Sequence, residues 1–153
     1  MDNNKLNFLV NDFPALLKQL KGDEKGQWGV MNAQQMIEHM SDSIKIANGK
    51  DPMKLHVPVE QVPAMKSFMM SDKEFRPNTK NALMSETPSS IRNRSIQDSV
   101  QELEKELADF VDYFQKNTSQ TLTNPFFGEL NFEEWVHLLD KHARHHLKQF
   151  NLL

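Results

Sequence analysis

SIQDSVQELEKELADFVDYFQKN, residues 95–117, carries the clearest helical pattern in the chain. Its apolar side chains recur in near-heptad steps, at Ile96, Val100, Leu103, Leu107, Phe110 and Phe114. This spacing places apolar residues on one face of an α-helix. Ser95 is a residue type that caps helix N-termini. We therefore predict a long helix that ends near Asn117 and packs through one face.

A first helical segment is predicted upstream, between about Lys5 and Leu20. Pro14 fits the first turn of a helix and disrupts an interior. We therefore expect a helix to begin near Phe13 with Asp12 as its cap, and any turn before it to be a separate, bent piece.

Two more helices complete the pattern. Asn32 can cap a helix that runs to about Ala47 and ends at the sequence NGK, and its inward stripe includes His39. Asn131 can cap the last helix, with Glu134 as its capping-box partner. Alternating strand-like runs are almost absent. The sequence thus predicts an all-α fold, a four-helix bundle forming one domain over residues 1–153.

Residues 50–94 form a long irregular connection between the second and third long helices, broken repeatedly by proline. Within it VPAMKSFMM, residues 62–70, predicts a short helix. A long irregular segment in a compact domain is often functional, though it can simply be mobile. Both interpretations stay open at this point.

Composition narrows the class of protein. With 153 residues, 38% hydrophobic and 25% charged, the chain is typical of one soluble domain. A formal net charge of −3 and scattered basic residues argue against a nucleic-acid partner. No run of about 20 apolar residues predicts a membrane span, and the polar N-terminus lacks the layout of a secretory signal. We expect a cytoplasmic protein without membrane contact.

Because cysteine is absent, a transition-metal site must use imidazole and carboxylate ligands.

The last helix concentrates the histidines. In KHARHHLKQF, residues 141–150, His142 and His146 lie one turn apart near the middle of the apolar face, and His145 lies at its margin. His137 falls on the opposite face, which we expect to be solvated, together with Lys141, Arg144 and Lys148.

Two interpretations of the His142–His146 pair compete. The pair can be core histidines satisfied by hydrogen bonds, but four ring nitrogens then need partners in a dry place. A divalent metal accepts one lone pair from each ring while the outer N–H groups bond elsewhere. His39, on the inward stripe of the second helix, supplies the third ligand that a site normally needs. These residues favour the metal interpretation over the core interpretation.

Two motifs carry a resemblance to a known family. QWGVMNAQQMIEHM (residues 27–40) and NPFFGELNFEEWVHLLDKHARHHLKQF (residues 124–150) resemble the DinB-like (YfiT-type) superfamily of metal-binding four-helix bundles, in a bacterial branch of unassigned function. Mapped by motif, the resemblance implies the metal ligands His39, His142 and His146. It leaves His145 as a neighbour of the site.

The expected function is that of a divalent-metal-dependent enzyme, and the resemblance implies a thiol-dependent transferase or a related small-molecule enzyme. The alternative is a non-catalytic metal- or ligand-binding module, for instance in a stress response. Three imidazoles do not choose strongly among zinc, nickel and iron. No catalytic base stands out, and Glu38 is expected to point off the stripe.

We expect His145 and Gln149 to surround the metal ligands. A substrate pocket is predicted beside them, lined by Met36, Trp135 and the NPFFG residues Phe126 and Phe127, although these two rings could instead plug the end of the bundle. Nine methionines and ten phenylalanines further predict a homodimer.

Overall fold

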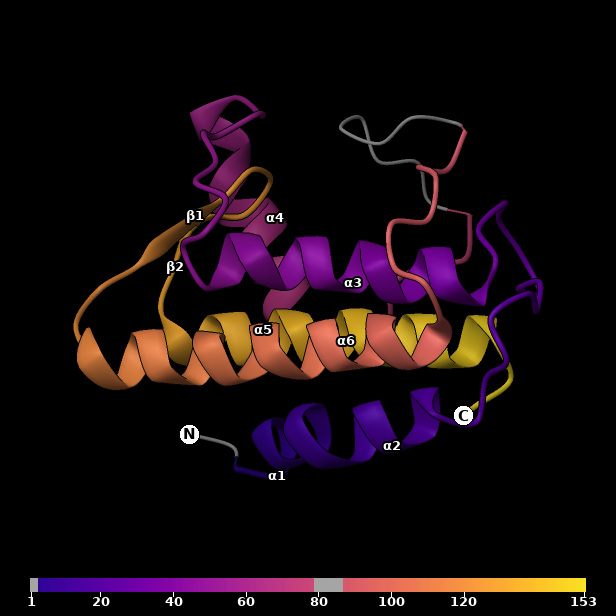
Figure 1. Ribbon diagram of the computed structural model, residues 1–153. Helices are drawn as coiled ribbons and strands as arrows, with labels where there is room; N and C mark the ends of the chain where they lie inside the picture. The colour runs from indigo at the N-terminus through magenta and orange to yellow at the C-terminus, as the bar shows by residue number, and fades with distance from the viewer. Residues whose placement is uncertain (1–2, 79–86) are drawn as a thin grey trace.

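The computed structural model describes residues 3–78 and 87–153. Three long helices, α3 (Ala33–Ala47), α5 (Ile96–Lys116) and α6 (Phe132–Gln149), run side by side (Figure 1). An N-terminal helical segment lies below α5 and α6 in this view. The apolar faces of these elements enclose one continuous core.

The ends of the long helices follow the predicted capping chemistry. The side chain of Asn32 accepts a hydrogen bond from the backbone N–H of Gln35, and the Gln35 side chain returns one to Asn32, which makes a capping box at the start of α3. Asn131 and Glu134 make the same reciprocal pair at the start of α6. Ser95 caps α5. All three predicted helix starts are therefore confirmed.

The N-terminal segment is one continuous helical stretch rather than a helix with a separate turn. It comprises α1 (Asn3–Asn7), the π-helical turn η1 (Phe8–Asp12) and α2 (Phe13–Leu17). Asp12 has helical backbone angles and makes no capping hydrogen bond, so its predicted role as a cap is wrong. A π-helical turn is a rare form that occurs mostly as a single turn within an α-helix, and Pro14 lies in the first turn of α2.

The prediction of a pure four-helix bundle is wrong. The described residues add a two-stranded antiparallel sheet, in which β1 (Leu122–Asn124) pairs with β2 (Gly128–Leu130), and they contain further short helices. Three-residue strands are too short to show an alternating pattern in the sequence. Gly128 has a φ of +77° at the turn, and a Cβ there would lie 2.9 Å from Val62. The fold is therefore mostly helical with a small β-hairpin.

The long connection contains the predicted short helix, α4 (Val62–Met70), preceded by a single 3-10 turn, η2 (Val59–Gln61). Farther along, the chain returns across α3 and is held there by Glu38. The carboxylate of Glu38 accepts hydrogen bonds from the backbone N–H groups of Arg92, at 2.8 Å, and Asn93, at 3.1 Å. No helix among residues 3–78 and 87–153 is long and apolar enough to cross a bilayer.

Candidate metal centre

Three histidines from two helices converge on one point. His39 comes from α3, and His142 and His146 come from successive turns of α6. Their candidate ligand atoms all lie within 4.8 Å of one another. The Nε2 atoms of His39 and His142 are 3.2 Å apart, and those of His142 and His146 are 2.9 Å apart. We refer to these three residues as the histidine cluster.

The spacing of the Nε2 atoms fits ligands of a shared ion. Nitrogen ligands at about 2.0–2.1 Å from one ion, with angles of about 90–110° between them, lie about 2.8–3.4 Å apart. Hydrogen bonding fits the same spacing less well, because an imidazole nitrogen offers either one hydrogen or one lone pair. The Nε2 atom of His142 faces two others, so it can bond properly to only one of them.

A relay of hydrogen bonds orients His146. The ring Nδ1 of His146 lies 2.7 Å from the Oε1 atom of Gln149. The amide nitrogen of Gln149 donates to the backbone carbonyl of Trp28 at 2.8 Å, which fixes the direction of the amide. Because Oε1 can only accept, Nδ1 of His146 carries the hydrogen and Nε2 presents its lone pair to the cluster. This is the tautomer that metal ligation requires.

Burial keeps the cluster neutral. It lowers the pKa of His39 to about 4, an effect that a nearby Asp42 carboxylate opposes and His145 reinforces. Burial also lowers the pKa of His142 well below its ordinary value, and mutual repulsion with His146 and His39 lowers it further. The pKa of His146 falls well below its ordinary value for the same reasons, burial first and His39 next. All three imidazoles therefore hold free lone pairs at neutral pH.

The cluster is not fully enclosed. His146 is buried, whereas His39 and His142 keep partial exposure. Aromatic side chains stand around them: the ring of Phe75 lies 6.3 Å from that of His142, and the ring of His145 lies 5.1 Å from that of His146. Aromatic rings thus form part of the surroundings of the cluster.

Glu38, which adjoins His39 in the sequence, does not belong to the histidine cluster. Glu38 is buried, and burial acts to raise its pKa, but the backbone hydrogen bonds from Arg92 and Asn93 and the side chains of Gln34 and Ser99 lower it overall. Its oxygens are occupied by these donors. Glu38 therefore anchors the returning chain at residues 92–93.

The four residues predicted to line a substrate pocket lie in the core or in the β-hairpin. Met36 and Trp135 are fully buried core side chains. Phe126 and Phe127 lie at the turn of the β-hairpin, where their N–H groups donate to the side chain of Asn124. None of the four lines the cavity described next.

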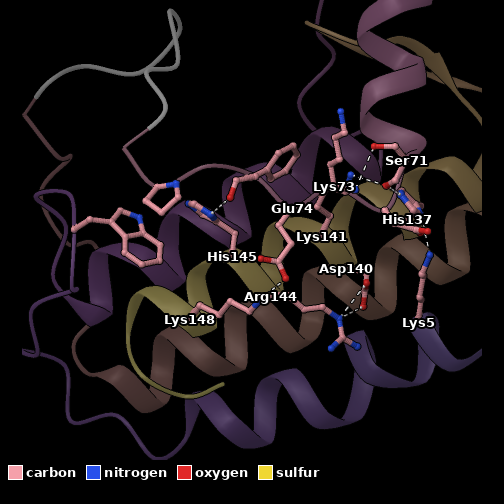
Figure 2. Close-up of a pocket in the computed structure, with 14 residues that line it drawn as sticks. Lys5, Ser71, Lys73, Glu74, His137, Asp140, Lys141, Arg144, His145 and Lys148 are labelled. Carbon is pink, nitrogen blue, oxygen red and sulfur yellow. Dashed lines mark hydrogen bonds and ion pairs between the residues drawn. The ribbon is translucent and has the colours of Figure 1, made fainter.

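That cavity lies between α6, Lys5 of α1 and the segment 71–77 (Figure 2). Its volume is about 220 Å³. Sequence reasoning expected this face of α6 to be solvated, but the segment after α4 runs across it. We call it the outer cavity.

Hydrogen bonds join the walls of the outer cavity. The Nζ of Lys5 lies 2.8 Å from Nδ1 of His137, and Nζ of Lys141 donates to the carbonyl of Ser71 at 2.8 Å. Figure 2 shows Lys5, His137, Ser71 and Lys141 close together at one end of the group of lining side chains. Burial lowers the pKa of Lys141, and the charge of Lys5 lowers it further, while Asp72 opposes them. The positive charges of Lys5 and Lys141 therefore lie beside the same small cavity.

Sequence reasoning missed Trp28, Phe75 and Lys5 as neighbours of the site. Each lies outside the two helices that carry the cluster, and Trp28 and Phe75 lie in irregular segments. No periodic signal places such residues, so only the folded chain brings them together.

Comparison with known proteins gives one family. A family model described as "Protein of unknown function (DUF1569)" matches residues 2–152. The chain belongs to this family. No curated protein and no solved structure matches the chain.

This family assignment overturns the resemblance to the DinB-like superfamily, because nothing in the matches links the chain to that group. The thiol-transferring activity that the resemblance implied therefore loses that support. The candidate centre stands on the geometry of its own residues.

Proposed function

We propose that this protein binds one divalent transition-metal ion through the Nε2 atoms of His39, His142 and His146, and uses it in the reaction of a small molecule. The observation that carries the proposal is the convergence of the three Nε2 atoms, with neighbouring pairs 3.2 and 2.9 Å apart. Zinc, nickel and iron all suit three imidazoles.

Three protein ligands leave coordination positions for water or substrate, an arrangement typical of catalytic rather than structural sites. An ion there would polarise a bound carbonyl or lower the pKa of a bound water or thiol. The protein's own part is to hold His146 through Gln149 and Trp28, and to exclude bulk water with Phe75 and neighbouring rings. A metal-dependent hydrolase or transferase fits these features.

A non-catalytic metal-binding module is the second candidate. The position of Glu38 favours it: this carboxylate adjoins His39 in sequence, but its oxygens hold the backbone of Arg92 and Asn93. It cannot serve as a general base without releasing that segment. Catalysis would then depend on the metal and its bound water or thiol alone.

Metal binding is tested by titrating tag-free protein with Co²⁺, since a histidine tag would bind the ion itself. We expect one Co²⁺ per chain with visible d–d absorption, and loss of that absorption in His39→Ala and His146→Ala. His145→Ala is the matched control, because His145 adjoins His146 in the helix but lies outside the cluster. Equal Co²⁺ binding by all four proteins would overturn the proposal.

Turnover separates the two candidates. Zinc-loaded and metal-free protein are compared on activated esters, where water is the nucleophile, and on a low-molecular-weight thiol with an electrophile. A metal-dependent rate that disappears in His142→Ala supports an enzyme. Stoichiometric metal binding without any rate supports the binding module.

A further inference from the structure

The outer cavity has a charge opposite to that of the protein as a whole. The chain carries a formal net charge of −3. The cavity wall, in contrast, contains more lysine and arginine side chains than carboxylates. The carboxylates of Asp140 and Glu74 are paired with Arg144 and Lys148. The three remaining cations, Lys5, Lys73 and Lys141, share the wall with one further carboxylate, that of Asp72.

Of these three cations, Lys5 and Lys141 have ammonium groups that are held in place by hydrogen bonds. Neither forms an ion pair with a carboxylate within residues 3–78 and 87–153. Their hydrogen bonds go to neutral groups, the ring of His137 and the carbonyls of Ser71 and Phe68. An ammonium has three N–H donors, so both side chains can donate to a further acceptor. Two cations beside one cavity favour a bound anion.

The rest of the wall suits the body of a small organic molecule. Trp28 and Phe75 add aromatic surface to the lining, and their rings border His145 at 5.4 and 6.3 Å. The cavity's volume of about 220 Å³ is below the range of about 300–1,000 Å³ found for drug-sized ligands. The ligand must therefore be small.

The outer cavity also borders the histidine cluster. Phe75 and His145 line the cavity, and the same two rings lie 6.3 Å from His142 and 5.1 Å from His146. One layer of side chains thus separates the two sites.

We infer that the outer cavity binds a small organic anion, whose carboxylate or phosphate group contacts Lys5 and Lys141 and whose apolar body lies against Trp28 and Phe75. The inference deepens the proposed function by naming the class of substrate. It rests on that function only for the statement that the bound anion is the molecule that reacts. Binding itself depends on the lysines and not on a metal.

The test measures binding of benzoate and phenyl phosphate to chelator-treated protein at low salt by calorimetry. Benzyl alcohol, which has a similar body and no charge, is the ligand control. We expect at least one of the two anions to bind, and benzyl alcohol to bind at least tenfold more weakly. Which anion binds better distinguishes a carboxylate ligand from a phosphate ligand. Failure of both anions to bind, or equal binding of benzyl alcohol, would overturn the inference.

Variants locate the bound anion. Lys5→Gln and Lys141→Gln should each raise the Kd of the anion roughly tenfold, because each removes a charged hydrogen-bond donor. Lys116→Gln removes the same charge from an exposed position at the end of α5 and should leave the Kd unchanged. Because Lys141 also holds the Ser71 carbonyl, Lys5→Gln serves as the variant with the smaller structural burden. An unchanged Kd in Lys5→Gln would place the anion elsewhere.

One further variant separates this inference from the proposed function. His142→Ala should bind the anion as wild type does. If binding instead requires added metal and disappears in His142→Ala, the anion binds the metal, so the cavity inference fails while the proposed function stands. If the lysine variants weaken binding but no metal binds to wild type, the cavity is an anion site and the proposed function fails.

Discussion

Two faces of α6 differ in their electrostatic character. Toward α3, His142 and His146 present neutral rings whose lone pairs meet at one point. On another face of α6, Lys141 and its neighbours present positive charge to a small cavity. The inner side is suited to a cation and the outer side to an anion, and the two lie one layer of side chains apart. Burial makes the difference, since it neutralises imidazoles readily and lysines only with difficulty.

Acid should affect the inner side most strongly. The pKa of His39 in the fold is about 4, below its ordinary value of 6.5, and those of His142 and His146 are also lowered. The unfolded chain therefore binds more protons in this range. Metal-free protein should lose stability as the pH falls from about 6.5 toward 4, by up to about 1.4 kcal/mol per pH unit for each histidine. Urea unfolding at several pH values measures this slope.

A variant that lacks one histidine of the cluster tests the cause of this pH dependence. His146→Gln should show a shallower decline of stability between pH 6.5 and 5, because one fewer buried imidazole takes up a proton on unfolding. Identical slopes in wild type and His146→Gln would show that the cluster does not control acid stability.

The second largest effect expected is the loss of stability when a chelator removes the metal. If the metal binds only the folded chain, a metal concentration of 100 times its Kd stabilises the fold by about 2.7 kcal/mol. A chelator should therefore lower the Tm of metal-loaded wild type and have no effect on His142→Ala. His137→Ala, on the outer side of the same helix, should keep the wild-type sensitivity. Equal sensitivity in wild type and His142→Ala would place the metal at another site.

Gln149 offers a finer test of the inner side. Replacing Gln149 with leucine removes the acceptor for Nδ1 of His146 and should weaken metal affinity about 10–100-fold without changing the stoichiometry. Gln149→Glu keeps an acceptor and should restore much of the affinity. Competition with a coloured chelator measures both values. Unchanged affinity in Gln149→Leu would show that the hydrogen bond does not orient the ligand.

The smallest effect is expected from the outer side. The guanidinium of Arg144 lies 3.8 Å from the ring centroid of Phe8 and pairs with Asp140 at 3.0 Å. Arg144→Ala should reduce the free energy of unfolding by about 1 kcal/mol, as expected for a partly buried cation–π contact. Metal affinity should not change, which thermal unfolding and Co²⁺ titration together check. A loss of metal binding in Arg144→Ala would mean that the two sides are coupled.

Local sequence was sufficient for the long helices. Ser95, Asn32 and Asn131 each cap a helix because a short polar side chain bonds to a backbone N–H three residues ahead. Such contacts lie within one turn and do not depend on the rest of the chain. The positions of His142 and His146 on one face of α6 follow equally from helical geometry. What sequence reasoning could not supply was the β-hairpin, since strands of three residues have no readable period.

The sequence by itself therefore determined the long helices, their starts and the side of each helix on which the histidines lie. The tertiary structure decided how closely His39 approaches the pair on α6, that Gln149 reaches the carbonyl of Trp28, and that the segment 71–77 covers the outer face of the same helix. The reason is physical. Capping and periodicity act over a few residues, whereas these contacts join residues 66 to 121 positions apart. Only the packing of the whole core sets their distances.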